Sequence, residues 1–142
     1  MTAKEYLEQA YRLDQRIDSK LEQVEMLRFL TTKTTATIKG DPGGGRSGDL
    51  MEDAIARIVD LEREIAAEIC RLTELKREIA EIIGRVEDPE EKIVLEMRYL
   101  GNKKWPEIGR AMNCSGTTVY RWHQNALKKV EEFLKSVVNG SK

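Results

Sequence analysis

The sequence predicts an all-α protein in which a long antiparallel coiled-coil hairpin precedes a small helix-turn-helix domain. Apolar residues recur every three or four positions through two long stretches, as on one face of a helix. Charged residues make up 35% of the 142 residues and aromatic residues only 6%, which favours long exposed helices over a large compact core. Proline is scarce, which also favours helix. We expect the hairpin over residues 1–86, the helix-turn-helix domain over residues 87–137 and a tail over residues 138–142.

The first helix is expected at residues 3–32. Thr2 and Glu5 have the spacing of a capping box, which satisfies free amides at the start of a helix. The apolar stripe that follows is narrow, with members spaced mostly by threes and fours: Tyr6, Ala10, Leu13, Ile17, Leu21, Val24, Leu27 and Leu30. Four threonines within residues 31–35 are expected to end this helix, because β-branched side chains lose rotamer freedom in a helix.

A glycine-rich segment, GDPGGGRSGD at residues 40–49, predicts a flexible linker over residues 34–49. It lacks the GK[ST] ending of a phosphate-binding loop, and no apolar strand precedes it, so a nucleotide site is disfavoured. The second helix is expected from about Asp49 to Val86. Its apolar seam keeps heptad spacing for about four repeats, with Glu68 at the skipped position: Ile58, Leu61, Ile65, Leu72, Leu75, Ile79, Ile82 and Val86.

Each of these narrow stripes needs a partner helix, because a single stripe cannot bury itself. One candidate is the other long helix, folded back through the glycine-rich linker. The other is the same helix of a second chain. The second helix is the longer of the two, so an intramolecular hairpin would leave part of its seam unpaired. We therefore expect self-association, as a homodimer through the two long helices.

A third helix is expected to begin at Asp88-Pro89. Aspartate can cap free amides, proline suits the first helical position, and Glu90 and Glu91 lie where the helix dipole favours anions. Its buried face is expected to hold Ile93, Val94, Met97 and Leu100. Gly101-Asn102 is expected to end it.

Residues 105–127, WPEIGRAMNCSGTTVYRWHQNAL, predict a short helix, a tight turn and a longer helix that continues to about residue 137. In the short helix Ile108, Ala111 and Met112 are expected to face inward. The turn is expected at Asn113-Cys114, and Ser115 suits the cap of the next helix. The longer helix has an apolar stripe with steps of three and four: Val119, Trp122, Ala126, Val130 and Leu134.

The opposite face of this longer helix has the side chains that a helix in the DNA major groove needs. Short polar, Arg or Gln side chains near the N-terminus can reach base edges, which makes these residues candidates for base contacts: Thr117, Thr118, Arg121 and Gln124. Surrounding cationic and polar side chains are candidates for phosphate contacts: Lys103, Lys104, Arg110, Ser115, Tyr120, Asn125, Lys128 and Lys129. The alternative is an ordinary small helical domain whose polar face is solvated.

The charge is unevenly distributed along the chain. Residues 1–87 hold 14 Lys and Arg against 18 Asp and Glu, whereas residues 88–142 hold 10 against 7. The second part is therefore mildly basic, a weak form of a nucleic-acid footprint. Two cysteines and one histidine make no metal-ligand cluster, and no catalytic set can be assembled, so neither a cofactor nor an enzyme is expected. We expect no signal peptide, no membrane span and a cytoplasmic protein.

The run EKIVLEMRYLGNKKWPEIGRAMNCSGTTVYRWHQNALKKVEEFL resembles sigma-70 region 4 and its helix-turn-helix relatives. The matching pattern is a helix ending in RYL, a short loop, W-x-E-I, a turn, S-x-x-T-V-x-R and AL-x-K. With the heptad-rich first part, the whole chain resembles ArpU/RinA-type late transcription regulators of phages and prophages. This resemblance implies a sequence-specific DNA-binding transcription regulator in a bacterial host cell, with Gly116, Thr117 and Arg121 at base-contacting positions.

The same sequence pattern is also compatible with two further functions. A small terminase-like DNA-packaging subunit would also join a helix-turn-helix to oligomerising helices. Alternatively, the module would bind protein only, for example RNA polymerase, with the coiled coil as an interaction arm. A mass measurement in solution and the salt dependence of DNA affinity distinguish these functions.

Overall fold

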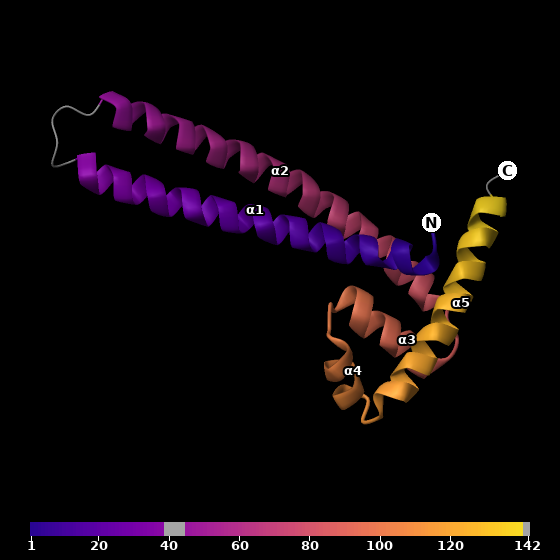
Figure 1. The fold of residues 1–142 in the computed structure, drawn as a ribbon. Helices are drawn as coiled ribbons and strands as arrows, with labels where there is room; N and C mark the ends of the chain where they lie inside the picture. The colour runs from indigo at the N-terminus through magenta and orange to yellow at the C-terminus, as the bar shows by residue number, and fades with distance from the viewer. Residues whose placement is uncertain (39–44, 141–142) are drawn as a thin grey trace. The chain divides into compact units, whose positions relative to one another are not determined.

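In a computed structural model, residues 1–38 and 45–140 are described, with side chains described for residues 1–33 and 48–137. The fold is all-α, as predicted, and these residues include no strand (Figure 1). The helices are α1 (Ala3–Ile38), α2 (Gly45–Gly84), α3 (Pro89–Leu95), the π-helical segment η1 (Glu96–Leu100), α4 (Trp105–Ala111) and α5 (Gly116–Gly140). No helix in the described part of the chain is both long and apolar enough to cross a membrane.

The chain forms two compact units. The hairpin unit comprises Leu13–Arg71, and the terminal unit comprises Met1–Arg12 together with Leu72–Lys142. The predicted boundary near residue 86 falls inside the terminal unit, because the start of α1 and the end of α2 pack into the same core as α3 and α5.

The hairpin unit pairs α1 with α2 in antiparallel orientation (Figure 1). Arg28 bonds Glu62 at 2.7 Å, and Lys20 bonds Glu68 at 2.8 Å, so residue numbers rise along one helix as they fall along the other. The buried apolar residues lie on facing stripes: Leu13, Ile17 and Val24 of α1, and Ile58, Leu61 and Ile65 of α2. The heptad seam therefore buries itself within one chain here.

Two predicted members of the α1 stripe are not buried. Leu21 and Leu30 remain 44% and 46% exposed. Leu27, another predicted member, is half-buried, and half-buried Lys20 lies beside the seam although the pattern did not include it. The stripe drifts around the helix because 3.6 residues per turn do not match a seven-residue repeat. The prediction chose the apolar Leu21, whereas its neighbour Lys20 lies closer to the seam.

A polar layer interrupts the hairpin seam at the position that the heptad pattern skips. Glu68 Oε1 accepts from Lys20 Nζ at 2.8 Å and lies 3.3 Å from Arg16 Nη2. Lys20 Nζ also lies 3.6 Å from Glu64 Oε2. The second oxygen of Glu68 is buried and has no hydrogen-bond partner among the described residues. A partly buried charge of this kind favours the one register in which its partner lies opposite.

We expect the double substitution Lys20→Met and Glu68→Leu to raise the free energy of unfolding by about 1 kcal/mol, because apolar side chains avoid the cost of desolvating two charges. Urea denaturation followed by circular dichroism measures the change. Glu68→Leu alone is expected to lower stability, since it leaves Lys20 partly buried without its nearest carboxylate. A loss of stability in the double variant would contradict this interpretation of the layer.

The threonines do not end α1, which continues six residues beyond the predicted limit of 32. Thr31 Oγ1 donates to Leu27 O at 2.7 Å, and Thr32 Oγ1 donates to Arg28 O at 2.9 Å. Each hydroxyl is thereby satisfied inside the helix, which removes the competition with the backbone that usually disfavours such residues. The predicted linker at residues 34–49 is correspondingly shorter, because residues 34–38 and 45–49 are helical. Its remainder, residues 39–44, lies outside the described residues.

The core of the terminal unit joins four helices and η1. Leu7 of α1, Ile83 of α2, Leu95 of α3, Tyr99 of η1 and Val130 of α5 are among its fully or nearly fully buried members. At the start of α1, Thr2 Oγ1 accepts from the Glu5 amide at 3.2 Å, as predicted for a cap. Glu131 Oε2 of α5 accepts from the Ala3 amide at 2.8 Å, which ties this helix start to α5.

The start of α3 confirms the predicted cap. Asp88 Oδ1 accepts from the amides of Glu90 and Glu91 at 3.0 and 3.1 Å, and these bonds, that to Glu91 first, hold the pKa of Asp88 below its usual value. Pro89 is the first helical residue. Glu91 is buried and pairs with Lys129 of α5, so α3 and α5 are joined by an ion pair as well as by packing.

The predicted buried face of the third helix is only partly right. Val94 is buried, but Ile93 is exposed. Leu95 and Tyr99, which the spacing did not single out, are buried against α1, α2 and α5. The helix therefore buries two faces rather than one.

The α-helical part ends at Leu95, and a π-helical turn completes it, in which the Gly101 amide donates to Glu96 O at 2.9 Å. A Cβ at Gly101 would lie 2.9 Å from Met97 O, so this position requires glycine. Asn102 follows with φ 53°, which is the left-handed end of the segment. The predicted end at Gly101-Asn102 is thus confirmed. At the other end of the unit, α5 continues to Gly140, into the predicted tail.

Candidate nucleic-acid interface

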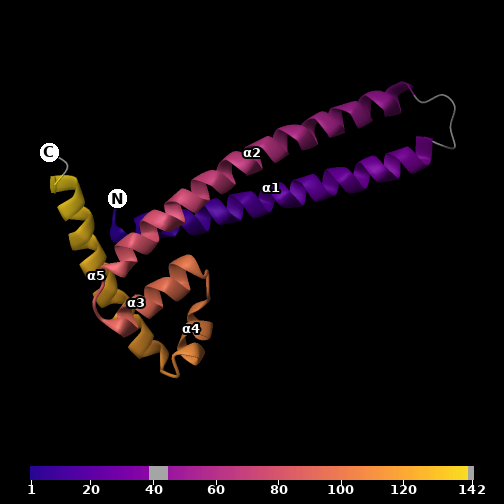
Figure 2. The same ribbon diagram turned by 180° about the vertical axis from the view of Figure 1, so that it is seen from behind.

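The short helix α4 packs against α5 and η1 (Figure 2). Ile108 and Gly109 are its buried residues, and Ile108 joins Val94 and Val119 in a small second core. Met112 packs at the edge of that core as predicted, whereas Ala111 is exposed. The prediction for Ala111 is wrong because the buried side of α4 is rotated toward Gly109. Since Gly109 has no side chain, the turn at Asn113-Cys114 can pack directly against it.

A tight turn joins α4 to α5, as predicted at Asn113-Cys114. Asn113 has φ 55°, and its amide donates to Arg110 O at 3.2 Å. The Cys114 amide donates to Gly109 O at 3.0 Å, and a Cβ on Gly109 would lie 3.3 Å from Cys114 O. These bonds satisfy the free carbonyl groups at the end of α4 and fix the direction in which α5 begins.

Ser115 caps α5. Its hydroxyl accepts from the Thr118 amide at 3.3 Å, and its carbonyl accepts from the Val119 amide at 3.1 Å. The Ser115 and Thr118 hydroxyl groups lie 3.1 Å apart. Both side chains were predicted to contact DNA, and in this structure their hydroxyl groups take part in the cap.

The other predicted base-contacting residues lie on one face of α5. Thr117, Arg121 and Gln124 are spaced by four and three, opposite the buried residues Val119 and Ala126. Thr117 and Arg121 are exposed, and Gln124 is half-buried. The first turns of α5 therefore present a polar, open surface that includes the backbone of Gly116.

The predicted phosphate-contacting residues divide into two groups. Seven side chains are exposed, including that of the cap residue Ser115: Lys103, Lys104, Arg110, Ser115, Tyr120, Asn125 and Lys128. Lys129 instead bonds the buried carboxylate of Glu91, and this bond is the first cause that raises its pKa. Lys129 is thus engaged in joining α3 to α5.

An aromatic cluster that was not predicted from the sequence lies behind the polar face of α5. The Tyr99 hydroxyl and His123 Nε2 share a hydrogen bond of 2.6 Å, and the Trp105 ring meets the His123 ring edge-on with centroids 4.5 Å apart. The Arg98 guanidinium lies 4.6 Å over the Trp105 ring and donates to Lys103 O at 3.1 Å. These contacts hold the loop between η1 and α4 against α5.

His123 is only 5% exposed. Burial first, then the positive charges of Lys4 and Arg98, lower its pKa to about 4, so the ring is neutral at pH 7. Burial likewise raises the pKa of Tyr99. His123 lies four residues after Val119 and three before Ala126, so the apolar spacing could have placed it on the buried side.

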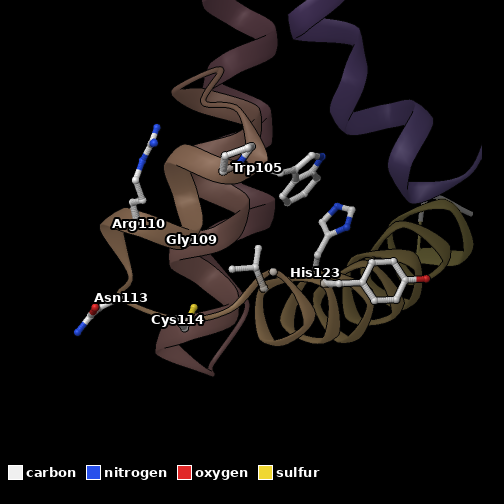
Figure 3. A pocket seen from close by; sticks show the side chains of 10 residues that line it. Trp105, Gly109, Arg110, Asn113, Cys114 and His123 are labelled. Carbon is white, nitrogen blue, oxygen red and sulfur yellow. The ribbon is translucent and has the colours of Figure 1, made fainter.

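A pocket opens between α4 and α5, and we call it the interhelical pocket (Figure 3). Its volume is about 670 Å³, within the range typical of small-molecule sites. Figure 3 shows its α4 wall, including Gly109 and Trp105, facing the α5 wall that carries His123. The lining residues come from both helices and the turn: Trp105, Pro106, Gly109, Arg110, Asn113, Cys114, Gly116, Val119, Tyr120 and His123.

A comparison with protein families matches residues 29–131 to a family described as a protein of unknown function, DUF1492. That match covers more than half of the 142 residues. The chain belongs to the DUF1492 family. The DUF1492 region includes all of α2, α3, α4 and the turn, together with most of α5, and therefore contains the whole interhelical pocket. Comparisons with curated proteins and with solved structures found no match.

Proposed function

We propose that this protein is a sequence-specific double-stranded DNA-binding transcription regulator of phage or prophage origin. In this proposal α4, the turn and α5 act as a helix-turn-helix, and the start of α5 enters the major groove. The observation that carries the proposal is the open face of α5, where Thr117 and Arg121 are exposed one turn apart behind a Ser115 cap. Side chains of this kind can reach base edges in the major groove.

The positive charge of residues 103–128 also supports the proposal that this face of α5 contacts DNA. Residues 103–128 hold five Lys or Arg residues and one acidic residue, Glu107. Within the part of the chain that the structure describes, none of the ion pairs involves Lys103, Lys104, Arg110 or Lys128. Cations that are not neutralised within the protein remain available to replace counterions on phosphate.

We further propose a homodimer through α1 and α2, so that two copies of α5 meet two half-sites of an operator. The hairpin unit supports this because large apolar side chains remain exposed on it, including Phe29 at 63%. The others are Leu21, Met26, Leu30, Leu50, Ile55, Val59 and Ile69. Isolated exposed apolar residues are normal, but so many on one helix pair are typical of an interaction surface.

Selection from random duplex DNA tests the main proposal. We expect one enriched motif, with affinity that falls steeply as salt rises. If no motif is enriched, sequence-specific recognition is wrong. Sedimentation velocity is expected to give a mass near twice 16.3 kDa. A ring of many subunits would favour the packaging alternative, and absence of any salt-dependent DNA binding would favour a protein partner such as RNA polymerase.

A further inference from the structure

The interhelical pocket has the lining of a small-molecule site for a flat ring. Trp105, Tyr120 and His123 contribute aromatic groups, and Val119 contributes an apolar side chain. Gly109 and Gly116 carry no side chain into the space, one on each wall. Pockets for drug-sized ligands are typically concave, mostly apolar and supplied with a few polar groups that set orientation.

The one charged residue in the lining of this pocket is cationic. Arg110 is part of the lining, which contains neither aspartate nor glutamate. Lys4 and Arg98 both act on the pKa of His123 as positive charges. A ligand with a negative group is therefore favoured over a neutral or cationic one, since opposite charges attract more strongly where water is partly excluded.

The pocket is also bounded by the two helices whose relative position sets the proposed DNA-reading face. The turn between them closes tightly over Gly109, where a Cβ would lie only 3.3 Å from Cys114 O. A ligand between α4 and α5 would therefore press on the segment that fixes where α5 begins, because packed elements shift rather than deform.

We propose that the interhelical pocket binds a small planar aromatic carboxylate, and that the bound ligand lowers the DNA affinity of α5. The second half of this proposal rests on the proposed function, whereas the first half does not. The carboxylate lies toward Arg110, and the ring lies among Trp105, Val119 and His123. A single mono- or bicyclic ring system suits a pocket of this volume.

Binding is tested on the full protein without DNA, with 2-naphthoate as the probe and 2-naphthylmethanol as its uncharged analogue. Isothermal titration is expected to show saturable binding of naphthoate, about tenfold tighter than that of the alcohol. Amide and indole NMR shifts are expected to concentrate on α4, the turn and the first half of α5. Absence of saturable binding, equal affinity for the alcohol, or shifts centred elsewhere would overturn the site.

Two glycines provide a matched pair of variants. A Cβ at Gly116 or at Gly84 would meet no atom within 4 Å, so neither position excludes a Cβ, but only Gly116 lines the pocket. Gly116→Leu is expected to weaken naphthoate binding at least about tenfold, and Gly84→Leu to leave it unchanged. Arg110→Gln is expected to remove the preference for the carboxylate. Binding by Gly116→Leu at the wild-type level would refute the assignment.

Regulation is tested separately, with the DNA motif obtained by selection. Saturating naphthoate is expected to lower the DNA affinity of the wild-type protein at least about threefold, and the alcohol at the same concentration to have no effect. If naphthoate binds but DNA affinity is unchanged, the regulatory half is wrong while the site stands. If selection yields no motif, the proposed function fails, and the titration without DNA still decides the site.

Discussion

Replacing Arg121 with alanine is expected to lower affinity for the selected DNA motif by about 10- to 100-fold, and affinity for random DNA by much less. Arg121 is exposed on the same face of α5 as Thr117 and Gln124, and the ion pairs of the described residues do not include it. Its guanidinium can therefore donate two parallel hydrogen bonds to a guanine edge. In the proposed complex, the alanine variant would lose the contact with one base pair and keep most phosphate contacts.

Fluorescence anisotropy with the selected duplex and with a scrambled duplex measures both affinities. Lys128→Ala serves as the comparison within α5, and it is expected to weaken binding to both duplexes and to reduce the salt slope by about one. Arg57→Ala, at an exposed position of the hairpin unit, controls for the loss of one positive charge and should change neither affinity. Equal losses on both duplexes for Arg121→Ala would contradict a base contact.

Protein stability is expected to fall as the pH is lowered from about 6.5 to about 4, with His123 as one identifiable cause. Burial first, and then Lys4 and Arg98, depress the pKa of His123 from 6.5 in the unfolded chain to about 4 in the folded one. Between these values the unfolded state binds more protons, so stability decreases as pH falls. A shift of this size corresponds to roughly 3 kcal/mol, and partial solvent screening reduces the expected loss to about 2 kcal/mol.

Urea denaturation at pH 7 and at pH 4 measures this loss, and His123→Phe isolates it. The variant keeps a ring of similar shape beside Trp105 but cannot be protonated. It leaves the Tyr99 hydroxyl without its partner, which lowers stability equally at both pH values. Carboxylates titrate in both proteins, so the informative quantity is the difference between their two losses. Identical losses would show that His123 does not bind its proton more weakly in the folded state.

Patterns that depend on local geometry were predictable from the sequence. The cap at Asp88-Pro89, the turn at Asn113-Cys114 and the cap at Ser115 each follow from what one residue can do for its neighbours. The heptad seam was predictable for the same reason, since spacing alone defines a face. For the candidate DNA face, helical spacing alone predicts that Thr117 and Arg121 lie on the side of α5 opposite its buried stripe.

What the sequence could not supply are pairings between residues far apart in the chain. Three such bonds join helices whose proximity cannot be predicted from local sequence patterns: Glu91 to Lys129, Tyr99 to His123, and Ala3 to Glu131. The same cause explains why Lys129, which bonds Glu91, was predicted to contact phosphate. The end of α1 was mispredicted because threonine propensity was weighed without the side-chain bonds that satisfy each hydroxyl inside the helix.

The polar layer at Lys20 and Glu68 also bears on how the length of the hairpin can vary. Beyond this layer, α1 and α2, the two arms of the hairpin, each contribute two seam residues per heptad. The ion pair between Lys20 and Glu68 fixes which residues of the two arms lie opposite each other. Deleting seven residues from each arm, between this layer and residues 39–44, would keep every remaining pair in place. Deleting three or four residues from one arm would turn the later side chains away from the seam. Natural relatives with hairpins of different length should therefore differ by whole heptads in matched positions of both arms.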